Sequence, residues 1–198
     1  MTDGKGGRIR GVRKKGISTL FWLAGLGLLL VLSIKYVPSL QKIIYPYPHR
    51  GIIEKYSAEY GVDPLFAVAV IREESRFFPR SESHKGAVGL MQLMPDTARE
   101  VAESLGESDF SEESLTVPEN NIRYGIKYLS MLEKQFSNNP ILVLAAYNSG
   151  QGRVKEWLAS EQLSLDHLKY EDIPFKETRN YVERVLKSYG KYQNLYSL

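Results

Sequence analysis

The sequence contains no cysteine, and this absence excludes two kinds of site. Without thiols the chain can form neither disulfide bonds nor thiolate metal centres. Its three histidines, His49, His84 and His167, are scattered and show no HExxH or paired ligand spacing, so no metal site is predicted. The sequence also lacks the GxSxG, P-loop and dinucleotide-binding fingerprints, and we therefore expect no cofactor.

Outside one short segment, the chain has no excess of basic over acidic charge. Residues 1–16 carry six basic side chains against Asp3 alone, an excess of +5, so the rest of the chain has a net charge of −2 within the total of +3. The basic character therefore belongs to a tail and not to a face of a folded domain. No nucleic-acid partner is expected.

An uncharged apolar run follows this tail. Residues 17–34 read ISTLFWLAGLGLLLVLSI, and a membrane-spanning helix needs about 20 mostly apolar residues. Lys35 and Tyr36 suit the far interface, and basic residues before a span favour a cytoplasmic N-terminus. A cleaved signal peptide is the alternative, but its apolar region is usually shorter, and no small-x-small cleavage site is apparent near residues 33–39. We therefore expect an uncleaved signal anchor in a single-pass membrane protein, with the domain outside.

The remaining sequence is typical of one globular domain after a linker. Pro38, Pro46 and Pro48 favour a stiff, extended linker close to polyproline II. Beyond it, the high share of apolar residues indicates a packed core. The expected division of the chain is a cytoplasmic tail at 1–16, a transmembrane anchor at 17–37, a linker at 38–49 and a catalytic domain at 50–198.

The domain is expected to be mainly α-helical around one buried helix. Residues 64–75 follow an Asp63-Pro64 helix start and are apolar nearly all round, which is typical of a buried helix. The glycine-rich residues 86–93 favour a small hairpin or irregular β element. Other helices are expected at residues 50–60, 94–105, 118–136, 140–148, 154–158 and 175–192.

Two adjacent glutamates, Glu73 and Glu74, end the predicted buried helix. A carboxyl group at such a place, facing a segment that approaches closely, is how proteins build an acid with a raised pKa. Neighbouring helical residues point about 100° apart, so one can face the core while the other faces water. Helical geometry does not choose between them, and both could be solvated at a fraying helix end.

Five motifs occur in a specific order along the domain. They are Glu74-Ser75; GAVGLMQLMPDTA at residues 86–98; Asn121 with Gly125 and Tyr128-Leu129; AAYNSG at residues 145–150; and Glu177-Thr178-Arg179-x-Tyr181-Val182. Together they resemble the catalytic domain of the soluble-lytic-transglycosylase family, the SLT domain of the goose-type lysozyme superfamily. The resemblance covers roughly residues 52–192, and the combination is far more specific than any single motif.

The resemblance implies a lysozyme-like α+β fold and a set of site residues. It makes Glu74 the catalytic acid and Tyr181 the tyrosine that helps to hold it. Supporting or substrate-binding positions are Ser75, Ser83, Gln92, Met94, Tyr147, Asn148 and Glu177. From the residues alone, core packing would be the better explanation for Met94, Tyr147 and Tyr181, and a backbone hydrogen bond for Gln92.

The resemblance also implies a reaction. The substrate would be the glycan strands of peptidoglycan in a bacterial cell wall, and the bond the β-1,4 link from N-acetylmuramic acid to N-acetylglucosamine. Cleavage would consume no water and would leave 1,6-anhydromuramoyl ends. A hydrolytic goose-type lysozyme is the alternative on the same scaffold. An inactive, membrane-tethered glycan-binding protein is a third interpretation, but a binder needs no buried acid at Glu74. No protein partner is indicated.

Overall fold

The computed structural model describes Met1 and residues 14–196, apart from the side chains of residues 14–20, 30 and 34–39. Most of the expected basic tail, residues 2–13, therefore lies outside the described residues. The chain divides into two compact units, Met1–Pro46 and Tyr47–Leu198.

The first unit contains one long helix, α1 (Lys14–Ile44). It continues through residues 38–44, so the prediction of an extended linker is wrong there. An interior proline removes one helical hydrogen bond and costs about 3 kcal/mol, but each further residue of a helix that is already formed adds a hydrogen bond, and α1 continues through Pro38. The helix ends just before Pro46, where the Tyr45 amide still donates to the Gln41 carbonyl at 2.8 Å. Within the described side chains, no helix combines the length and the apolar character needed to cross a membrane.

The second unit is a helical domain, and its helices confirm the predicted ones to within a few residues. Proline opens α3, α4, α5 and α6, where a missing N–H costs nothing because the first turn has no partner for it. The elements are α2 (Arg50–Tyr60), α3 (Pro64–Ser75), α4 (Pro95–Ser104), η1 (Glu112–Thr116), α5 (Pro118–Gln135), α6 (Pro140–Ser149), α7 (Gln151–Ala159), η2 (Tyr170–Asp172) and α8 (Lys176–Tyr196).

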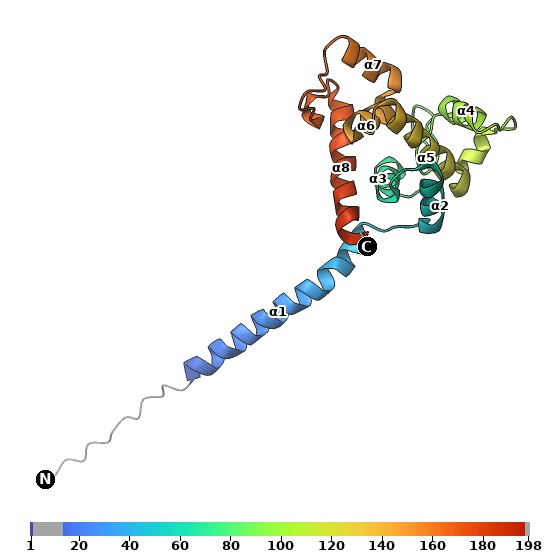
Figure 1. The fold of residues 1–198 in the computed structure, drawn as a ribbon. Helices are drawn as coiled ribbons and strands as arrows, with labels where there is room; N and C mark the ends of the chain where they lie inside the picture. The colour runs from blue at the N-terminus through green and yellow to red at the C-terminus, as the bar shows by residue number, and fades with distance from the viewer. Residues whose placement is uncertain (2–13, 197–198) are drawn as a thin grey trace. The chain divides into compact units, whose positions relative to one another are not determined.

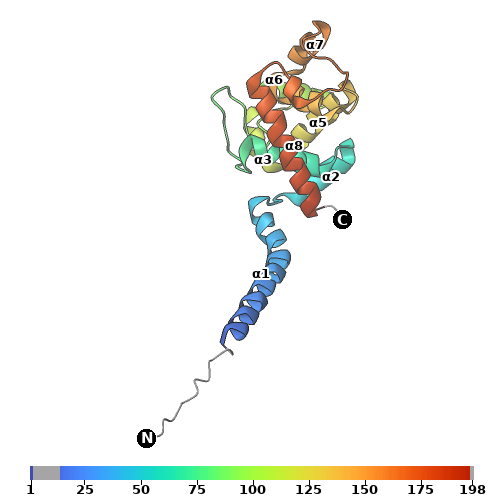
Figure 2. The same ribbon diagram turned by 90° about the vertical axis from the view of Figure 1, so that its left-hand side faces the viewer.

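Helix α3 is the centre of this domain, as its apolar sequence predicts. The Asp63 carboxylate accepts a hydrogen bond of 2.7 Å from the Leu65 amide and so caps the first turn. Residues 66–71 are all buried. Figure 1 shows α3 with α2, α5, α6 and α8 around it, and the most extensive helix packing joins α3 to α8. In Figure 2, α8 runs down the near face of the domain beside α3.

The predicted β element is smaller than a hairpin. It consists of two isolated antiparallel bridges, Glu82–Val88 and Val88–Leu93, and the described part of the domain has no strand. The Asn121 side chain makes the backbone hydrogen bonds that a neighbouring strand would make in a sheet. The Asn121 amide accepts from the Met91 backbone N–H at 2.7 Å and donates to the Val88 carbonyl at 2.9 Å. The loop is therefore fixed by these two bridges together with a buried asparagine on α5.

Candidate active site

The domain carries a cleft of about 360 Å³ at the C-terminal end of α3. A second hollow of about 290 Å³ adjoins it, because the two share five lining residues. The cleft is lined by Glu74, Ser83, His84, Lys85, Ala87, Gln92, Met94, Tyr147, Asn148 and Glu177. It thus brings together residues from α3, α6, α8 and the loop before α4, which lie far apart in the sequence.

Glu74 is the carboxyl group of this cleft that is held most closely. The buried Tyr181 hydroxyl, presented by α8, donates a hydrogen bond of 2.6 Å to Glu74 Oε1. Burial raises the pKa of Glu74 to about 7, although the Tyr181 hydrogen bond and the charge of Arg184 act in the opposite direction. A carboxyl group with this pKa can both donate and accept a proton near neutral pH.

The adjacent Glu73 has a different environment. Its side chain is only 8% exposed, and Oε1 accepts hydrogen bonds of 2.6 Å from both Arg72 Nη1 and Ser188 Oγ. Arg184 Nε lies 3.5 Å from its other oxygen. Glu73 is thus a carboxylate paired with guanidinium groups, whereas Glu74 faces a neutral phenol and the cleft. The structure separates two neighbours that helical geometry alone leaves equivalent.

Tyr147 supports the opposite side of the cleft. Its hydroxyl donates to the Met91 carbonyl at 2.7 Å, and its ring packs against Tyr128 with centroids 5.4 Å apart. Burial and the nearby Glu74 charge raise the Tyr147 pKa well above its ordinary value, so the phenol stays neutral. Its contact with Met91 ties α6 to the loop that closes the cleft.

The loop before α4 is held by its own polar side chains. Ser83 Oγ accepts hydrogen bonds from the backbone N–H groups of Lys85 and Ala87 at 3.3 and 3.0 Å. Gln92 Nε2 donates to the carbonyls of Ser81 and Gly89, each at 3.0 Å. These bonds give the cleft a wall of fixed shape, while Met94, 43% exposed, offers an apolar surface to it.

Ser75 and Tyr181 are the predicted site residues that do not line the cleft, and of the two only Tyr181 bonds the Glu74 carboxyl group. Ser75 instead ends a helix. Its hydroxyl donates to the Ile71 carbonyl at 3.2 Å and accepts from the Phe77 amide at 3.1 Å. These contacts end α3 and support the left-handed conformations of Arg76 and Phe77. The structure thus places Ser75 behind Glu74 as a helix-ending residue.

Three residues that the sequence analysis did not name as site residues also line the cleft: His84, Lys85 and Ala87. They lie between Ser83 and the rest of the glycine-rich segment, both of which were identified. Nothing in a polar loop sequence distinguishes a residue that faces a cleft from one that faces bulk water. Only their position between two identified segments could have pointed to them.

The comparisons with known proteins agree with this geometry. The family model described as "Transglycosylase SLT domain" matches residues 51–168, more than half of the chain. The chain belongs to the SLT transglycosylase domain family. The match confirms the resemblance seen in the sequence motifs.

Curated relatives of this SLT domain are lytic murein transglycosylases. The soluble lytic murein transglycosylase of Escherichia coli K12 is 38% identical over 144 residues, which cover 72% of this chain and 22% of that protein. The membrane-bound lytic murein transglycosylase C of Klebsiella pneumoniae is 36% identical over 149 residues, 70% of this chain and 41% of that protein. The chain thus spans only about a fifth of the length of the first of these relatives.

Solved structures show the same fold for the SLT domain. An inactive glutamate-to-glutamine mutant of lytic transglycosylase Slt from Pseudomonas aeruginosa superposes with a TM-score of 0.70 at 39% identity, covering 78% of this chain and 26% of that one. The 70 kDa soluble lytic transglycosylase of Escherichia coli gives a TM-score of 0.73 at 35% identity, with 79% and 26% covered. A 70 kDa soluble lytic transglycosylase has also been solved in complex with bulgecin A.

Proposed function

We propose that this SLT domain is a peptidoglycan lytic transglycosylase in which Glu74 is both general acid and general base. One observation carries the proposal: Glu74 lies in a cleft, held by Tyr181, with burial raising its pKa to about 7. Such a group is protonated often enough at neutral pH to give a proton, and it is basic enough to take one back.

In the first step, protonated Glu74 donates its proton to the glycosidic oxygen between N-acetylmuramic acid and N-acetylglucosamine. The bond from C1 to this oxygen breaks, and the N-acetylglucosamine leaves as an alcohol. The muramoyl 2-acetamido oxygen bonds to C1 and forms an oxazolinium ion, so the substrate supplies the internal nucleophile. Glu74 is now a carboxylate, and the Tyr181 hydrogen bond stabilises its charge.

In the second step, the Glu74 carboxylate accepts the proton of the muramoyl 6-hydroxyl. O6 attacks C1, the bond from the acetamido oxygen breaks, and a 1,6-anhydro ring forms. Glu74 regains its proton, and no water is consumed. We propose that Ser83, Gln92, Met94 and Asn148 contact the sugars, since they line the cleft around Glu74. The Pseudomonas aeruginosa neighbour, inactive when a glutamate is replaced by glutamine, also supports an essential glutamate.

A hydrolytic lysozyme remains the second candidate because Glu177 lines the same cleft as Glu74. Hydrolases with two carboxylates place them about 6.5–9.5 Å apart when they invert and about 5–5.5 Å apart when they retain configuration. Glu177 stands in the first turn of α8, one turn before Tyr181. In the transglycosylase we propose, Glu177 carries out no proton transfer and only shapes the cleft.

Mass spectrometry of the products separates the two candidates. The purified chain is incubated with peptidoglycan strands in ¹⁸O-labelled water. We expect anhydromuramoyl ends, one water lighter than hydrolytic ends and without label. Chitin oligomers, which keep the acetamido group but lack the muramoyl lactyl group, should remain uncut. Labelled reducing ends that disappear in Glu177→Gln would instead establish the lysozyme.

We also propose that residues 17–37 anchor the domain in the bacterial cell membrane, with residues 1–16 in the cytoplasm and residues 50–198 on the cell-wall side. The basic tail, the uncharged run at residues 17–34 and relatives named as membrane-bound support this proposal. Part of the run lies outside the described side chains. A reporter that works only after export, fused after Leu198, should be active, and the mature protein should keep its basic tail. Cleavage near Ser39 would refute an uncleaved anchor.

A further inference from the structure

Glu73 joins the two helices that form the acid site. It precedes Glu74 on α3, and its carboxylate contacts Ser188 and Arg184 on α8. Arg72 Nη1, 2.6 Å from Glu73 Oε1, also reaches Ser188 Oγ at 3.4 Å. A side chain that could have been a solvated residue at a helix end is therefore almost fully enclosed by cationic and hydroxyl donors.

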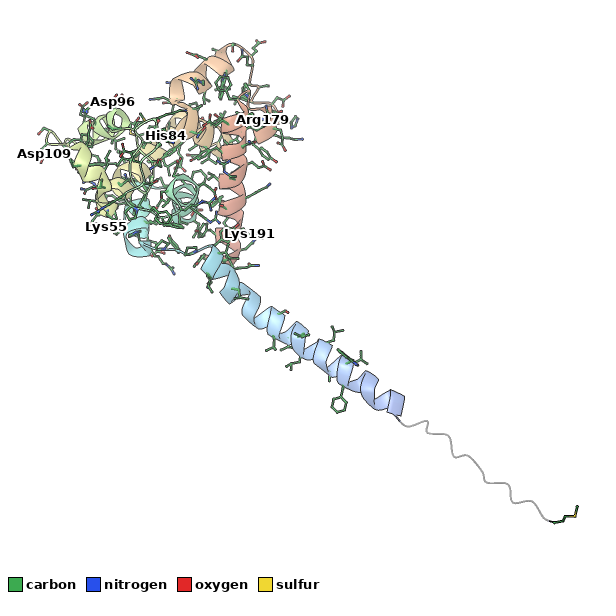
Figure 3. The ribbon with its side chains drawn as sticks, turned by 180° about the vertical axis from the view of Figure 1, so that it is seen from behind. Lys55, His84, Asp96, Asp109, Arg179 and Lys191 are labelled. Carbon is green, nitrogen blue, oxygen red and sulfur yellow. The ribbon has the colours of Figure 1, made fainter. Side chains whose placement is uncertain are left out.

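The contacts of Glu73 and Glu74 come from one face of α8. Tyr181, Arg184 and Ser188 are spaced at i, i+3 and i+7, which aligns their side chains along a helix. Tyr181 reaches Glu74, whereas Arg184 and Ser188 reach Glu73. In Figure 3, Arg179 and Lys191 mark the stretch of α8 that carries this face. The contacts of Arg184 and Ser188 with Glu73 therefore also help to fix the position of Tyr181 relative to Glu74.

The charged groups around Glu74 do not all shift its pKa. Apart from burial and Tyr181, the nearby groups that act on the Glu74 pKa are Arg184, which lowers it, and Glu73, which raises it. The other titratable groups facing the cleft are Tyr147 on α6, Glu177 on α8, and His84 and Lys85 on the loop. Tyr147 is a neutral phenol, and the exposed side chains of His84 and Lys85 are screened by water.

We propose that Glu73 is a positioning residue of the active site: its carboxylate, held by Ser188 on α8, lies against Arg184 and offsets the positive charge that Arg184 places near Glu74. The proposal rests on the function proposed above. Arg184 alone would favour the ionised form of Glu74, which cannot act as an acid. Paired with Glu73 at 3.5 Å, its charge is partly offset at Glu74.

A purely structural role predicts different behaviour. Glutamine at position 73 could still accept a hydrogen bond from Ser188, but it leaves the guanidinium groups of Arg72 and Arg184 without their carboxylate, which lowers stability at every pH. What glutamine cannot do is cancel the charge of Arg184. The proposal therefore concerns the pH dependence of catalysis and not the stability of the fold.

The test is a double-mutant cycle on the purified full chain, reading kcat/KM on peptidoglycan strands against pH. The alkaline limb is the part of this pH profile where kcat/KM falls as the pH rises. In Glu73→Gln, this limb should move to lower pH by roughly half a unit to one unit. The rate at pH 8 should then fall about 3- to 10-fold more than the rate at pH 5. In Arg184→Gln, the limb should move to higher pH. The double variant should move back toward the wild-type limb, because the Arg184 charge that Glu73 offsets is then also absent, while Arg72 keeps its charge.

Arg50 and Glu54 on α2 provide matched controls. Arg50 Nε lies 2.7 Å from Glu54 Oε1, and neither residue is among the charges that act on Glu74. Glu54→Gln and Arg50→Gln make the same charge changes and should leave the limb unmoved. A limb that moves equally in these controls would show a general effect of net charge and overturn the proposal.

Two further outcomes decide the matter. An equal loss at every pH in Glu73→Gln, with the limb unmoved, would reduce Glu73 to a packing role. If Glu73→Gln does not fold, Arg184→Gln still tests the proposal, because Arg184 is 54% exposed and its loss should be tolerated. Titration of the Glu74 carboxyl by ¹³C NMR in each variant needs no substrate, so it judges this proposal even if the wild-type chain does not cleave peptidoglycan.

Discussion

The Tyr181 hydroxyl lies 2.6 Å from Glu74 Oε1, although the two residues are 107 positions apart in the chain. A phenol that donates to a carboxyl group stabilises its charged form, whereas burial stabilises the neutral form. Burial is the larger effect, and the pKa of Glu74 rises to about 7. The pair therefore combines a raised pKa with a fixed orientation of the acid, and the first two predictions concern these two properties.

Replacing Tyr181 by phenylalanine should shift the pH profile as well as slow the reaction. The change removes a donor to the ionised form, so the pKa of Glu74 should rise and the alkaline limb of kcat should move to higher pH. Loss of orientation should lower kcat by roughly 10- to 100-fold at the optimum. Tyr170→Phe removes a hydroxyl that bonds Glu183 instead, and it should change neither quantity. A limb displaced to lower pH in Tyr181→Phe would contradict this account.

Replacing Glu74 by glutamine should abolish cleavage and yet stabilise the fold at high pH. Because the folded pKa of about 7 exceeds the unfolded value of 4.5, the native state holds its proton longer than the unfolded state. The wild-type free energy of unfolding therefore falls as the pH rises from 4.5 to 7. Glutamine removes this loss, a gain of up to about 3 kcal/mol above pH 7. The rate should drop by roughly 10²-fold or more.

Urea unfolding at pH 4 and pH 8 measures this effect within one pair of proteins. Wild type and Glu74→Gln should differ little at pH 4, where Glu74 is neutral in both states. They should differ at pH 8, with the variant more stable. Equal differences at the two pH values would mean that Glu74 is not protonated in the folded state near neutral pH.

Replacing Gly89 by alanine should destabilise the domain by at least about 2 kcal/mol, because strain and overlap add. Gly89 has a φ of 82°, and an added Cβ would lie 2.1 Å from Asn121 Nδ2 and 2.5 Å from the Leu115 carbonyl oxygen. Gly86 is the matched control, since its φ of 84° brings the same strain but its Cβ would meet nothing within 4 Å. Gly86→Ala should therefore cost only about 1–2 kcal/mol. Similar losses in urea unfolding would show that the close approach to Asn121 does not matter.

Replacing Tyr147 by phenylalanine should lower stability without moving the pH profile. The Met91 carbonyl would lose its donor at 2.7 Å, which costs roughly 1–3 kcal/mol for a buried group. Tyr147 is not among the groups that shift the Glu74 pKa, so the alkaline limb should stay in place. Measured beside Tyr181→Phe, this variant distinguishes the tyrosine that holds the cleft wall from the one that holds the acid.

Local signals in the sequence were sufficient for most of the helices. Asp63 with Pro64 and Asn139 with Pro140 each combine a capping side chain with a first-turn proline, and α3 and α6 begin at these prolines. Capping and helix initiation depend on residues within one turn, so a sequence window contains all the information. The prediction of an extended, proline-rich linker was wrong because it considered only the residues around Pro38. Pro38 favours an extended chain only where the preceding helix does not continue through it, and α1 does continue.

The motifs in the sequence identified the family and most residues of the cleft, and the resemblance pointed to Glu74, but only the tertiary structure gives Glu73 and Glu74 different surroundings. Glu73 and Glu74 occupy the same helix end, and no property within α3 separates them. What separates them is α8, which brings Tyr181 to one and Arg184 with Ser188 to the other. Asn121 is a second example: its side chain lies on α5, 30 residues after Met91, and accepts the Met91 backbone hydrogen bond that a neighbouring strand would otherwise accept. A carboxyl pKa is set by burial and by the charges within a few ångströms, and these are properties of packing between helices that are distant in the sequence.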